Sequence, residues 1–464
     1  MWQRIKNIYH LGNAFLANLW FGFPSRYLTV IGVTGTDGKT TTVSLIYHIL
    51  HQAGYNVSMI SSVGAVIGGK DYDVGFHVTT PSASALQGFI NKALRSLRQF
   101  KNFSNASVPA AHYLSPRDTV VFGDSSEKFS HAKAPRALGY LILEVTSHAI
   151  DQNRIWGIPF DIAVLTNITH EHLDYHKTYE NYVETKAKLL KMARVAVVNR
   201  DDESYNLIKS KVQFKSKKFV TYGMGRNAEV NPKTFPFKTN LIGEFNKYNV
   251  LAAVAACREL RISDQFIREA LLTFKPPIGR EEIVYKDSFT VMIDFAHTPN
   301  AFEEILSSIK SPLSPRLRRT RGRIIHVFGS AGERDASKRP LMGRVSAKYA
   351  DVIVLTAEDP RSENVEKIMS EISSGIQNSK LSPHPNPLPR GEREKGEGEK
   401  KYLFKISDRK KAIEAAIKMA RKGDFVLVTG KSHEKSMNYG KGEVPWDEYE
   451  AVRNSLRLRK IKNE

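Results

Sequence analysis

The chain contains the stretch Thr34-Gly35-Thr36-Asp37-Gly38-Lys39-Thr40-Thr41-Thr42, a glycine-rich segment that ends in lysine and threonine. An apolar run, Tyr27–Ile31, precedes it, and apolar residues at helical spacing follow it. The order strand, glycine-rich loop, helix aims backbone N–H groups and a helix N-terminus at a phosphate chain. Lys39 can reach terminal phosphates, and the Thr40 hydroxyl can ligate Mg²⁺. Val33 stands where the common phosphate-loop pattern has glycine, so this is a tighter Gly-x-x-Gly-Lys-Thr form. We predict a nucleotide site here rather than an ordinary glycine turn.

Length and composition indicate a globular protein of more than one domain. The 464 residues suffice for two or three domains with full cores, and 41% of them are hydrophobic. The single cysteine, Cys257, excludes an intrachain disulfide framework and suits a reducing compartment, so we expect a cytoplasmic protein. Cys257 lies in a small-residue helical pattern, which indicates core packing. No apolar run is long enough to span a bilayer.

The first 23 residues are aromatic and mildly basic, and two interpretations of them stay open. No small-residue cleavage site follows, which argues against a signal peptide. The segment can form an amphipathic helix that lies on a membrane surface. It can also form a helix that packs on the first domain, and this is the interpretation that we favour.

The net charge of +21 is compatible with nucleic-acid binding, but its distribution argues against it. The excess lies largely in patches that look peripheral: Lys209 to Lys218, Arg316 to Arg321, and the tail from Arg453 to Lys462. No basic groove with interleaved aromatic residues is evident. A solvated face, or attraction of an anionic substrate, explains the charge better, so we predict no nucleic-acid partner.

Apolar strand-like runs alternate with helical stretches such as Asp408 to Lys422, a pattern typical of βαβ units and mostly parallel sheets. The predicted buried strands are 141–143, 162–165, 195–198, 291–293, 324–328, 352–355 and 425–428. We expect a short N-terminal segment at 1–27, one domain at 28–275 and a second at 276–464, with the boundary at Pro276-Pro277. The stretches 100–135 and 381–401 lack a clear period or are rich in proline and alternating charge, so we expect mobile loops without a catalytic role.

Polar residues follow the ends of two predicted strands, where ligands collect in α/β sheets. Glu144 follows the strand at 141–143, and a carboxylate there can hold the Mg²⁺ of a nucleotide bound at Lys39. The run from Thr166 to His176 includes histidines and carboxylates that can ligate a metal. Its spacing is not that of a structural zinc site, and cysteines are absent from it.

Six motifs in a fixed order now carry a resemblance. They are Gly-Val-Thr-Gly-Thr-Asp-Gly-Lys-Thr-Thr, Glu144-Val145-Thr146-Ser147-His148, His172-Leu173-Asp174-Tyr175-His176, Gly243-Glu244-Phe245-Asn246, Gly279-Arg280-Glu281-Glu282 and Asp294-Phe295-Ala296-His297-Thr298-Pro299. Together they resemble the Mur ligase family, and within it the synthetases that add the third residue of the peptidoglycan stem peptide. The resemblance runs from about residue 28 to about residue 450, apart from the two insertions.

The resemblance implies an α/β protein with a P-loop central ATPase domain, mostly parallel in its sheet, and a Rossmann-like C-terminal domain. It implies ATP and Mg²⁺ as cofactors, and UDP-N-acetylmuramoyl-L-Ala-D-Glu and an amino acid as substrates. ATP would phosphorylate the γ-carboxylate of D-Glu, and the incoming amine would displace phosphate to form the amide. Catalysis would then be mainly positioning and charge neutralisation.

The resemblance also implies roles for individual residues. ATP would be bound by Gly35, Thr36, Asp37, Gly38, Lys39, Thr40, Thr41, Asn246, Arg280, Asp294 and His297. Magnesium would be held by Thr40, Glu144, His172 and a carbamylated Lys186; with Lys39, the last three form the catalytic set. Substrates would be bound by Thr79, Thr80, Ser147, Gln152, Arg154, Arg334, Asp359, Arg361, Gly430 and Glu434. Lys186 by itself looks like any lysine on a helix surface, so its role rests on the family.

The amino-acid end of the site favours diaminopimelate. Glu358-Asp359-Pro360-Arg361 resembles the Asp-Asn-Pro-Arg motif of the diaminopimelate-adding enzymes, and Gly430 to Glu434 resembles Gly-Lys-Gly-His-Glu. An arginine can clamp the distal carboxylate of diaminopimelate in a bidentate pair, which a lysine substrate would not need. The alternative for Arg361 is a surface salt bridge. Asp359 replaces the usual amide, Glu171 the usual Asp, Phe295 the usual Tyr and Ser330 the usual Cys.

The largest departure is at the N-terminus, where only residues 1–33 precede the phosphate loop. Typical members carry a UDP-binding domain there, so we expect this domain to be reduced. Either the muramoyl-peptide part alone holds the substrate, or the carrier differs, for example a lipid-linked precursor.

Competing functions stay open. A folylpolyglutamate-type or Mur-like amidating ligase shares the ATP site, and the Thr79-Thr80-Pro81 and Gly430 to Glu434 motifs argue against it. A P-loop NTPase acting on nucleic acid and a degenerate binding protein are the others, although Lys39, Glu144, His172 and Lys186 are all present. We expect a monomer.

Overall fold

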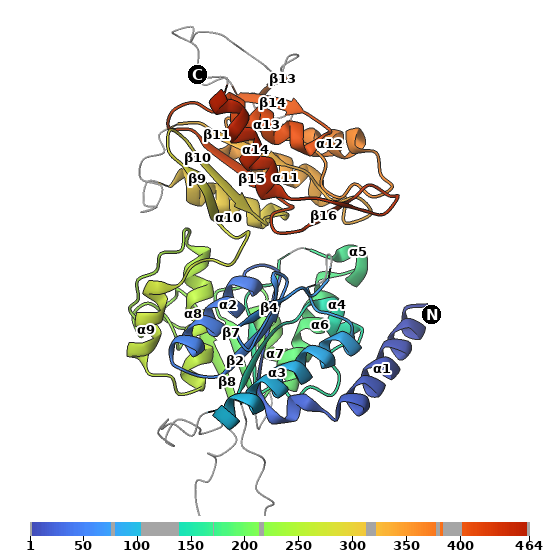
Figure 1. Ribbon diagram of the computed structural model, residues 1–464, viewed down its shortest axis with the longest axis vertical. Helices are drawn as coiled ribbons and strands as arrows, with labels where there is room; N and C mark the ends of the chain where they lie inside the picture. The colour runs from blue at the N-terminus through green and yellow to red at the C-terminus, as the bar shows by residue number, and fades with distance from the viewer. Residues whose placement is uncertain are drawn as a thin grey trace, which may run out of the picture. The chain divides into compact units, whose positions relative to one another are not determined.

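The computed structural model describes residues 2–75, 79–103, 139–169, 171–212, 218–311, 322–376, 381–383 and 401–461 (Figure 1). The chain divides into two compact units. Unit 1 comprises Met1–His170, His176–Asn240 and Phe245–Lys275. Unit 2 comprises Glu171–Tyr175, Leu241–Glu244 and Pro276–Glu464.

Unit 1 is built on an eight-stranded sheet in the order β4-β3-β2-β5-β1-β6-β7-β8. Its strands are β1 (Thr29–Thr34), β2 (Val57–Ser61), β3 (Gly64–Ile67), β4 (Lys70–Tyr72), β5 (Tyr140–Glu144), β6 (Ile162–Leu165), β7 (Val195–Asn199) and β8 (Lys218–Tyr222). β2, β5, β1, β6, β7 and β8 pair in parallel, and β3 pairs antiparallel with both β2 and the edge strand β4. β1 is buried along its whole length and apolar between its two terminal threonines, as expected for a parallel sheet covered on both faces.

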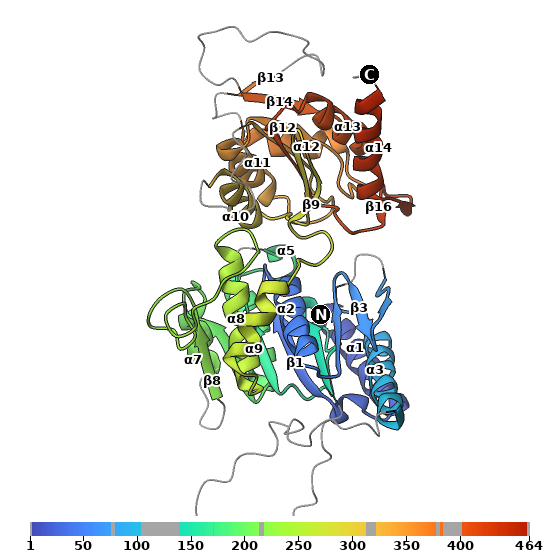
Figure 2. The same cartoon turned by 60° about the vertical axis from the view of Figure 1, so that its left-hand side comes forward.

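Helices cover both faces of this sheet (Figure 2). On one face lie α2 (Lys39–Gln52), α8 (Phe245–Glu259) and α9 (Asp264–Thr273). On the other lie α3 (Ala83–Phe103), α4 (Ser147–Asp151), α6 (Tyr179–Met192) and α7 (Tyr205–Val212), with α1 (Trp2–Phe21) packed on α3. Cys257 is buried in α8, which confirms the prediction of core packing.

Unit 2 is a seven-stranded sheet in the order β13-β14-β12-β11-β15-β10-β9. Its strands are β9 (Glu282–Lys286), β10 (Thr290–Asp294), β11 (Ile324–Phe328), β12 (Val352–Leu355), β13 (Leu381–Pro383), β14 (Lys401–Lys405) and β15 (Phe425–Thr429). Only β9 is antiparallel. A separate hairpin joins β16 (Ser436–Asn438) and β17 (Glu443–Pro445).

Alternate residues of the unit 2 strands face two helical layers, because successive side chains point to opposite faces. Ile324 and Phe328 of β11 pack with α10 (Pro299–Lys310), α11 (Lys338–Tyr349) and α12 (Val365–Ser374). Ile325 and Val327 pack with α13 (Arg409–Met419) and α14 (Glu448–Ile461). Every strand predicted from the sequence is present, and the predicted α/β class with mostly parallel sheets is confirmed.

Some predictions differ from the structure at their edges. Residues 100–103 of the first expected loop continue α3, and residues 381–383 and 401 of the second lie in β13 and β14. The rest of both stretches, and the basic patch at 316–321, lie outside the described residues. Within the described part of the chain, none of the helices combines the length and the hydropathy needed to cross a bilayer.

Candidate active site

The glycine-rich loop lies between the end of β1 at Thr34 and the start of α2 at Lys39. Gly38 precedes α2 in the left-handed conformation, with φ of 79°, and provides no side-chain cap to the first N–H groups. A Cβ atom at this position would lie 2.2 Å from Oδ1 of Asn249, so glycine is required. The uncapped N-terminus of α2 therefore suits a phosphate group.

The end of the neighbouring strand β6 braces this loop. The backbone N–H of Thr36 donates to Asn167 O at 2.8 Å, and that of Asp37 donates to Asn167 Oδ1 at 2.9 Å. The Thr166 hydroxyl donates to Asp37 O at 2.6 Å. Sequence reasoning missed this role of Thr166 and Asn167, although both directly follow the predicted strand at 162–165.

Glu144 and Thr40 meet at the mouth of the loop. The parallel pairing of β1 and β5 places Glu144 opposite Val33. The Thr40 hydroxyl donates to Glu144 Oε2 at 3.0 Å, and the backbone N–H of Ser62 donates to the same oxygen at 3.0 Å. Carboxylate and hydroxyl oxygens are ligands that Mg²⁺ prefers, so this pair fits a magnesium ion bound with a nucleotide.

Lys186 is almost fully buried in α6, at 1% exposure, although the sequence around it looks like that of any lysine on a helix surface. Its Nζ donates to Gly35 O at 2.8 Å and lies 4.6 Å from the centre of the Tyr182 ring. The helix packs on β1 and β6, which turns this side chain beneath the phosphate loop. The buried ammonium of Lys186 therefore lies next to the backbone of the phosphate loop.

The substrate residues predicted in unit 1 form a hydrogen-bonded group around Thr80. Its hydroxyl donates to Glu144 O at 3.0 Å, and Arg154 donates to Thr80 O at 3.0 Å. Arg154 also donates to Gln152 Oε1, at 3.0 and 2.6 Å. The Ser147 hydroxyl contacts Nε2 of His176 at 3.0 Å. The adjacent Thr79 is half-buried.

The histidine-rich run is divided between the two compact units. His176 belongs to unit 1, where burial, followed by His148 and Lys186, lowers its pKa to about 4. Glu171 and His172 belong to unit 2, and His170 lies outside the described residues. Across the described ranges, no three His, Cys, Asp or Glu side chains are placed to hold one ion.

Glu171 instead forms an ion-pair cluster within unit 2. Its carboxylate lies 3.4 Å from His297 Nε2 and 3.7 Å from His172 Nε2. Burial opposes its charged form, but His172, His297 and Lys338 together hold the pKa of the carboxyl well below its usual value. Glu171 is therefore ionised at neutral pH, and within unit 2 His172 lies beside its carboxylate.

The remaining predicted ATP residues lie at helix and strand ends. Asn246, in α8 of unit 1, accepts from Asn249 at 2.9 Å. Asp294 ends β10 in unit 2 and accepts from the backbone N–H groups of Glu281 and Ala296, each at 2.7 Å, while burial raises its pKa. The guanidinium of Arg280 lies 4.4 Å from the ring centre of Phe295, the residue that replaces the usual tyrosine.

Two arginines predicted to recognise the amino acid lie near each other in unit 2. Arg361 donates to Gly332 O at 2.9 Å, two residues before Arg334. Desolvation, followed by the positive charge of Arg361, lowers the pKa of Arg334. Two guanidinium groups that repel each other are stabilised by an anion between them, so this pair suits a carboxylate.

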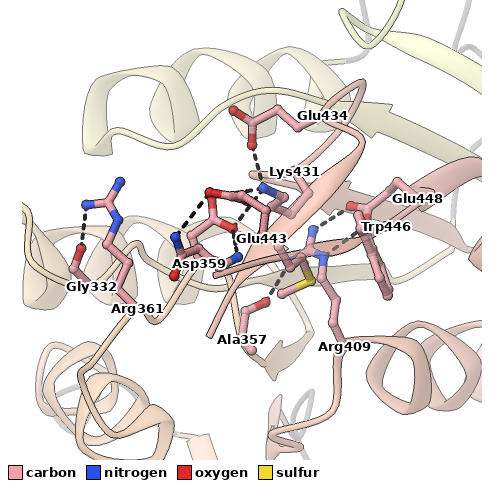
Figure 3. A network of polar contacts seen from close by, with 12 residues as sticks. Gly332, Ala357, Asp359, Arg361, Arg409, Lys431, Glu434, Glu443, Trp446 and Glu448 are labelled. Atoms are coloured by element: carbon pink, nitrogen blue, oxygen red, sulfur yellow. Dashed lines mark hydrogen bonds and ion pairs between the residues drawn. The ribbon is translucent and has the colours of Figure 1, made fainter. Parts of the chain in front are cut away.

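Asp359 and Glu434 converge on a lysine that sequence reasoning did not select (Figure 3). Lys431, fully buried, donates to both oxygens of Asp359 at 2.9 and 3.0 Å and to Glu434 Oε2 at 2.6 Å. Asp359 also accepts from the backbone N–H of Asn438 at 2.9 Å. Lys431 therefore balances the negative charge of Asp359, the residue that replaces the family's amide. The bond from Asn438 also links Asp359 to the β16–β17 hairpin.

Glu358 is a second residue that sequence reasoning left out of the site. It is 7% exposed, and its Oε2 has no hydrogen-bond partner among the described residues. Burial raises the pKa of this carboxyl. A Cβ atom on Gly430 would lie 2.1 Å from Oε2, which explains the glycine at that position. The sequence offered one signal for Glu358, which is its position three residues after the strand at 352–355 and beside Asp359.

Arg409 anchors the two loops that carry these residues (Figure 3). Its guanidinium donates to Ala357 O at 3.2 Å and to Thr429 O at 2.7 Å, the carbonyls just before Glu358 and Gly430. It also forms a fully buried ion pair with Glu448, at 2.9 Å from Nε to Oε2.

Arg409→Ala is expected to destabilise the protein by about 3–5 kcal/mol, because it leaves Glu448 buried without its partner. Urea unfolding measures the loss. The double variant Arg409→Met with Glu448→Leu, which removes both charges, should recover most of it. Lys367→Ala is the control, since this exposed lysine lies 4.0 Å from Glu371 and should cost less than about 1 kcal/mol. Equal losses for Arg409→Ala and the control would contradict the anchoring role.

Comparison with protein families gives two matches along the chain. The Mur ligase middle domain matches residues 33–100 and 127–257, most of which belong to unit 1. The Mur ligase glutamate ligase domain matches residues 279–432, in unit 2.

Several known proteins are similar to this chain over most of its length. UDP-N-acetylmuramoyl-L-alanyl-D-glutamate–2,6-diaminopimelate ligase of Aquifex aeolicus is 33% identical over 458 residues, which are 95% of this chain and 80% of that protein. A solved structure of a ligase with the same name is 25% identical, with a TM-score of 0.52, and the match covers 93% of this chain and 79% of that one. FolC of E. coli, solved with ADP, shares the fold with a TM-score of 0.61 at 18% identity, over 98% and 94% of the two chains.

Proposed function

The chain belongs to the Mur ligase family of ATP-dependent, ADP-forming amide ligases, and on that premise we propose that it adds meso-diaminopimelate to UDP-N-acetylmuramoyl-L-Ala-D-Glu. The bond formed is an amide between the γ-carboxylate of D-Glu and an amine of the diamino acid. The proposal places this reaction in the cytoplasm and assigns it to a monomer.

One observation carries the nucleotide part of the proposal: Thr40 and Glu144 meet at the mouth of a loop beneath which Lys186 is buried. Lys39 begins α2, where its ammonium and the helix N-terminus both favour anionic phosphate. Thr40 and Glu144 would hold one Mg²⁺, and a carbamylated Lys186 would hold a second. Bound Mg²⁺ would neutralise the charge of the phosphates.

The proposed reaction has two steps, activation of the D-Glu carboxylate and attack by the amine. The γ-carboxylate of D-Glu attacks the terminal phosphorus of ATP, giving an acyl phosphate and ADP. The amine of the incoming amino acid attacks the acyl carbon, and phosphate leaves as the amide forms and a proton is lost. Lys39 stabilises charge on the transferring phosphoryl group, while Thr80 and Arg154 orient the muramoyl-peptide.

The choice of diaminopimelate rests on charged side chains of unit 2. The distal carbon of this amino acid carries both a carboxylate and an ammonium. The neighbouring Arg334 and Arg361 suit the carboxylate, and the carboxylates of Glu358 and Glu434, beside Gly430, suit the ammonium. The side chain of lysine ends in an ammonium alone and would leave both arginines without an anion.

Phosphate release tests the function. The protein is incubated with ATP, Mg²⁺ and UDP-N-acetylmuramoyl-L-Ala-D-Glu, together with meso-diaminopimelate, L-lysine or neither. Release that depends on diaminopimelate, with the tripeptide product seen by mass spectrometry, supports the proposal. Release that depends on lysine would reassign the amino acid. The absence of phosphate release in all three mixtures would overturn the proposed acceptor.

Arg361→Ala is expected to raise KM for meso-diaminopimelate by about 10- to 100-fold, since a charge-assisted hydrogen bond contributes about 1.5–3 kcal/mol. KM for ATP should stay unchanged, which separates recognition from a general loss of structure. Arg453→Ala is the matched control. This arginine on α14 is exposed and makes a long, solvent-exposed ion pair of 3.8 Å with Asp447, so its loss should leave KM unchanged. An unchanged KM for diaminopimelate in Arg361→Ala would remove this arginine from the recognition site.

A further inference from the structure

Helix α1 presents a broad apolar face to solvent. Ile8, Tyr9, Leu16, Leu19 and Trp20 are 70%, 69%, 66%, 52% and 85% exposed. At about 100° per residue these side chains, together with the partly exposed Leu11 and Phe15, occupy about half of the helix circumference. Single exposed apolar residues are ordinary on a protein surface, but a continuous face of this size indicates an interaction.

The opposite face of α1 is firmly packed on unit 1. Ala14 and Asn18 are fully buried, and Ala17 is 6% exposed. The side-chain amide of Asn18 donates to Ala14 O at 2.8 Å and to Trp156 O at 2.9 Å. Within unit 1, α1 lies on the outside of α3 (Figure 1). The favoured sequence interpretation, a packed helix, therefore describes one face of α1 and leaves the other to be explained.

The charges on and beside α1 indicate what covers this face. The helix sequence contains Arg4 and Lys6 and no Asp or Glu. Lys6 is exposed near its start, and Arg26 is exposed just beyond its end. Trp20 and Tyr9, the exposed aromatic residues, are types that prefer the boundary between lipid and water. An apolar face with basic residues at both ends is complementary to an anionic lipid surface.

We propose that the apolar face of α1, defined by Ile8, Tyr9, Leu16, Leu19 and Trp20, docks unit 1 on an anionic lipid surface. The helix lies in the plane of the interface, with its apolar side chains among the acyl chains and Lys6 and Arg26 near the headgroups. This inference rests on α1 and the adjacent Arg26 and is independent of the proposed reaction.

Vesicle flotation of the full chain tests the proposal. Wild-type protein is mixed with phosphatidylglycerol-containing vesicles or with phosphatidylcholine vesicles at low and at high salt. Flotation with the anionic vesicles at low salt is expected, with a weaker response at high salt as the charges are screened. Absence of flotation with anionic vesicles at low salt would overturn the proposal.

Matched variants identify the surface. Leu16→Glu with Leu19→Glu should reduce flotation at least tenfold, and both side chains are exposed, so folding is not at stake. Phe266→Glu with Leu272→Glu on α9 changes two similarly exposed residues of the same unit and should leave flotation unchanged. Equal flotation of the two double variants would contradict the assignment to α1. So would self-association in analytical ultracentrifugation that only the α1 variant abolishes, because a second copy would then cover the face.

Discussion

Lys39→Ala is expected to lower the rate of ATP-dependent amide formation by about 100-fold or more, a loss on the order of 3 kcal/mol of transition-state stabilisation. Lys39 is the first residue of α2, and its Nζ is held at 2.6 Å from Thr36 O within the loop. In the proposed reaction, this ammonium would stabilise the negative charge that develops on the transferring phosphoryl group. Alanine keeps the helix and removes only that charge.

Two measurements separate this effect from unfolding. The melting temperature of Lys39→Ala should match that of the wild type, because the side chain is only partly buried. Lys70→Ala, at an exposed position of β4, serves as the control and should retain full activity. Retained turnover in Lys39→Ala would refute the assignment of the phosphate loop.

Lys186→Ala is expected to lose about 100-fold or more in activity and to regain part of it when acetate or formate is added. A carbamate converts a lysine from a cation to an anion, and a short carboxylate can enter the space left by the deleted side chain and replace that charge. The buried position of Lys186, 2.8 Å from Gly35 O, places such an anion directly beneath the phosphate loop.

The same helix provides the control for this second variant. Lys188 is half exposed and lies 4.0 Å from Asp151, so Lys188→Ala should keep wild-type activity and show no response to added carboxylates. ¹³C NMR of the wild type under ¹³CO₂ should show a carbamate signal that Lys186→Ala lacks. Wild-type activity in Lys186→Ala, or an activity loss without rescue and without that signal, would remove the carbamate.

Local patterns were sufficient for the secondary structure and for two groups of candidate residues, one in each unit. Strand, glycine loop and helix around residues 34–42 are present as predicted, since each depends on neighbours within a few residues. The pairs Glu358-Asp359 and Gly430-Lys431 follow predicted strands and lie at strand ends in unit 2. The roles of these residues in binding stay predictions, to be tested by the variants described above.

Long-range packing decided the rest. Thr40 and Glu144 are 104 positions apart, and they meet because β5 pairs with β1 in parallel register. Lys186 is buried because its helix packs on the sheet, which no local pattern reveals. Conversely, Glu171, His172 and His176 are close in sequence, but the fold assigns them to different compact units.

The sequence by itself determined the α/β class, the phosphate loop and the family, because ordered motifs and periodicity are local properties of the chain. Only the tertiary structure decided which carboxylate meets Thr40, that Lys431 compensates Asp359, and that α1 buries one face and exposes an apolar one. These outcomes depend on strand order and on which helix face finds a partner. Both are set by the balance of apolar burial and polar pairing over the whole chain.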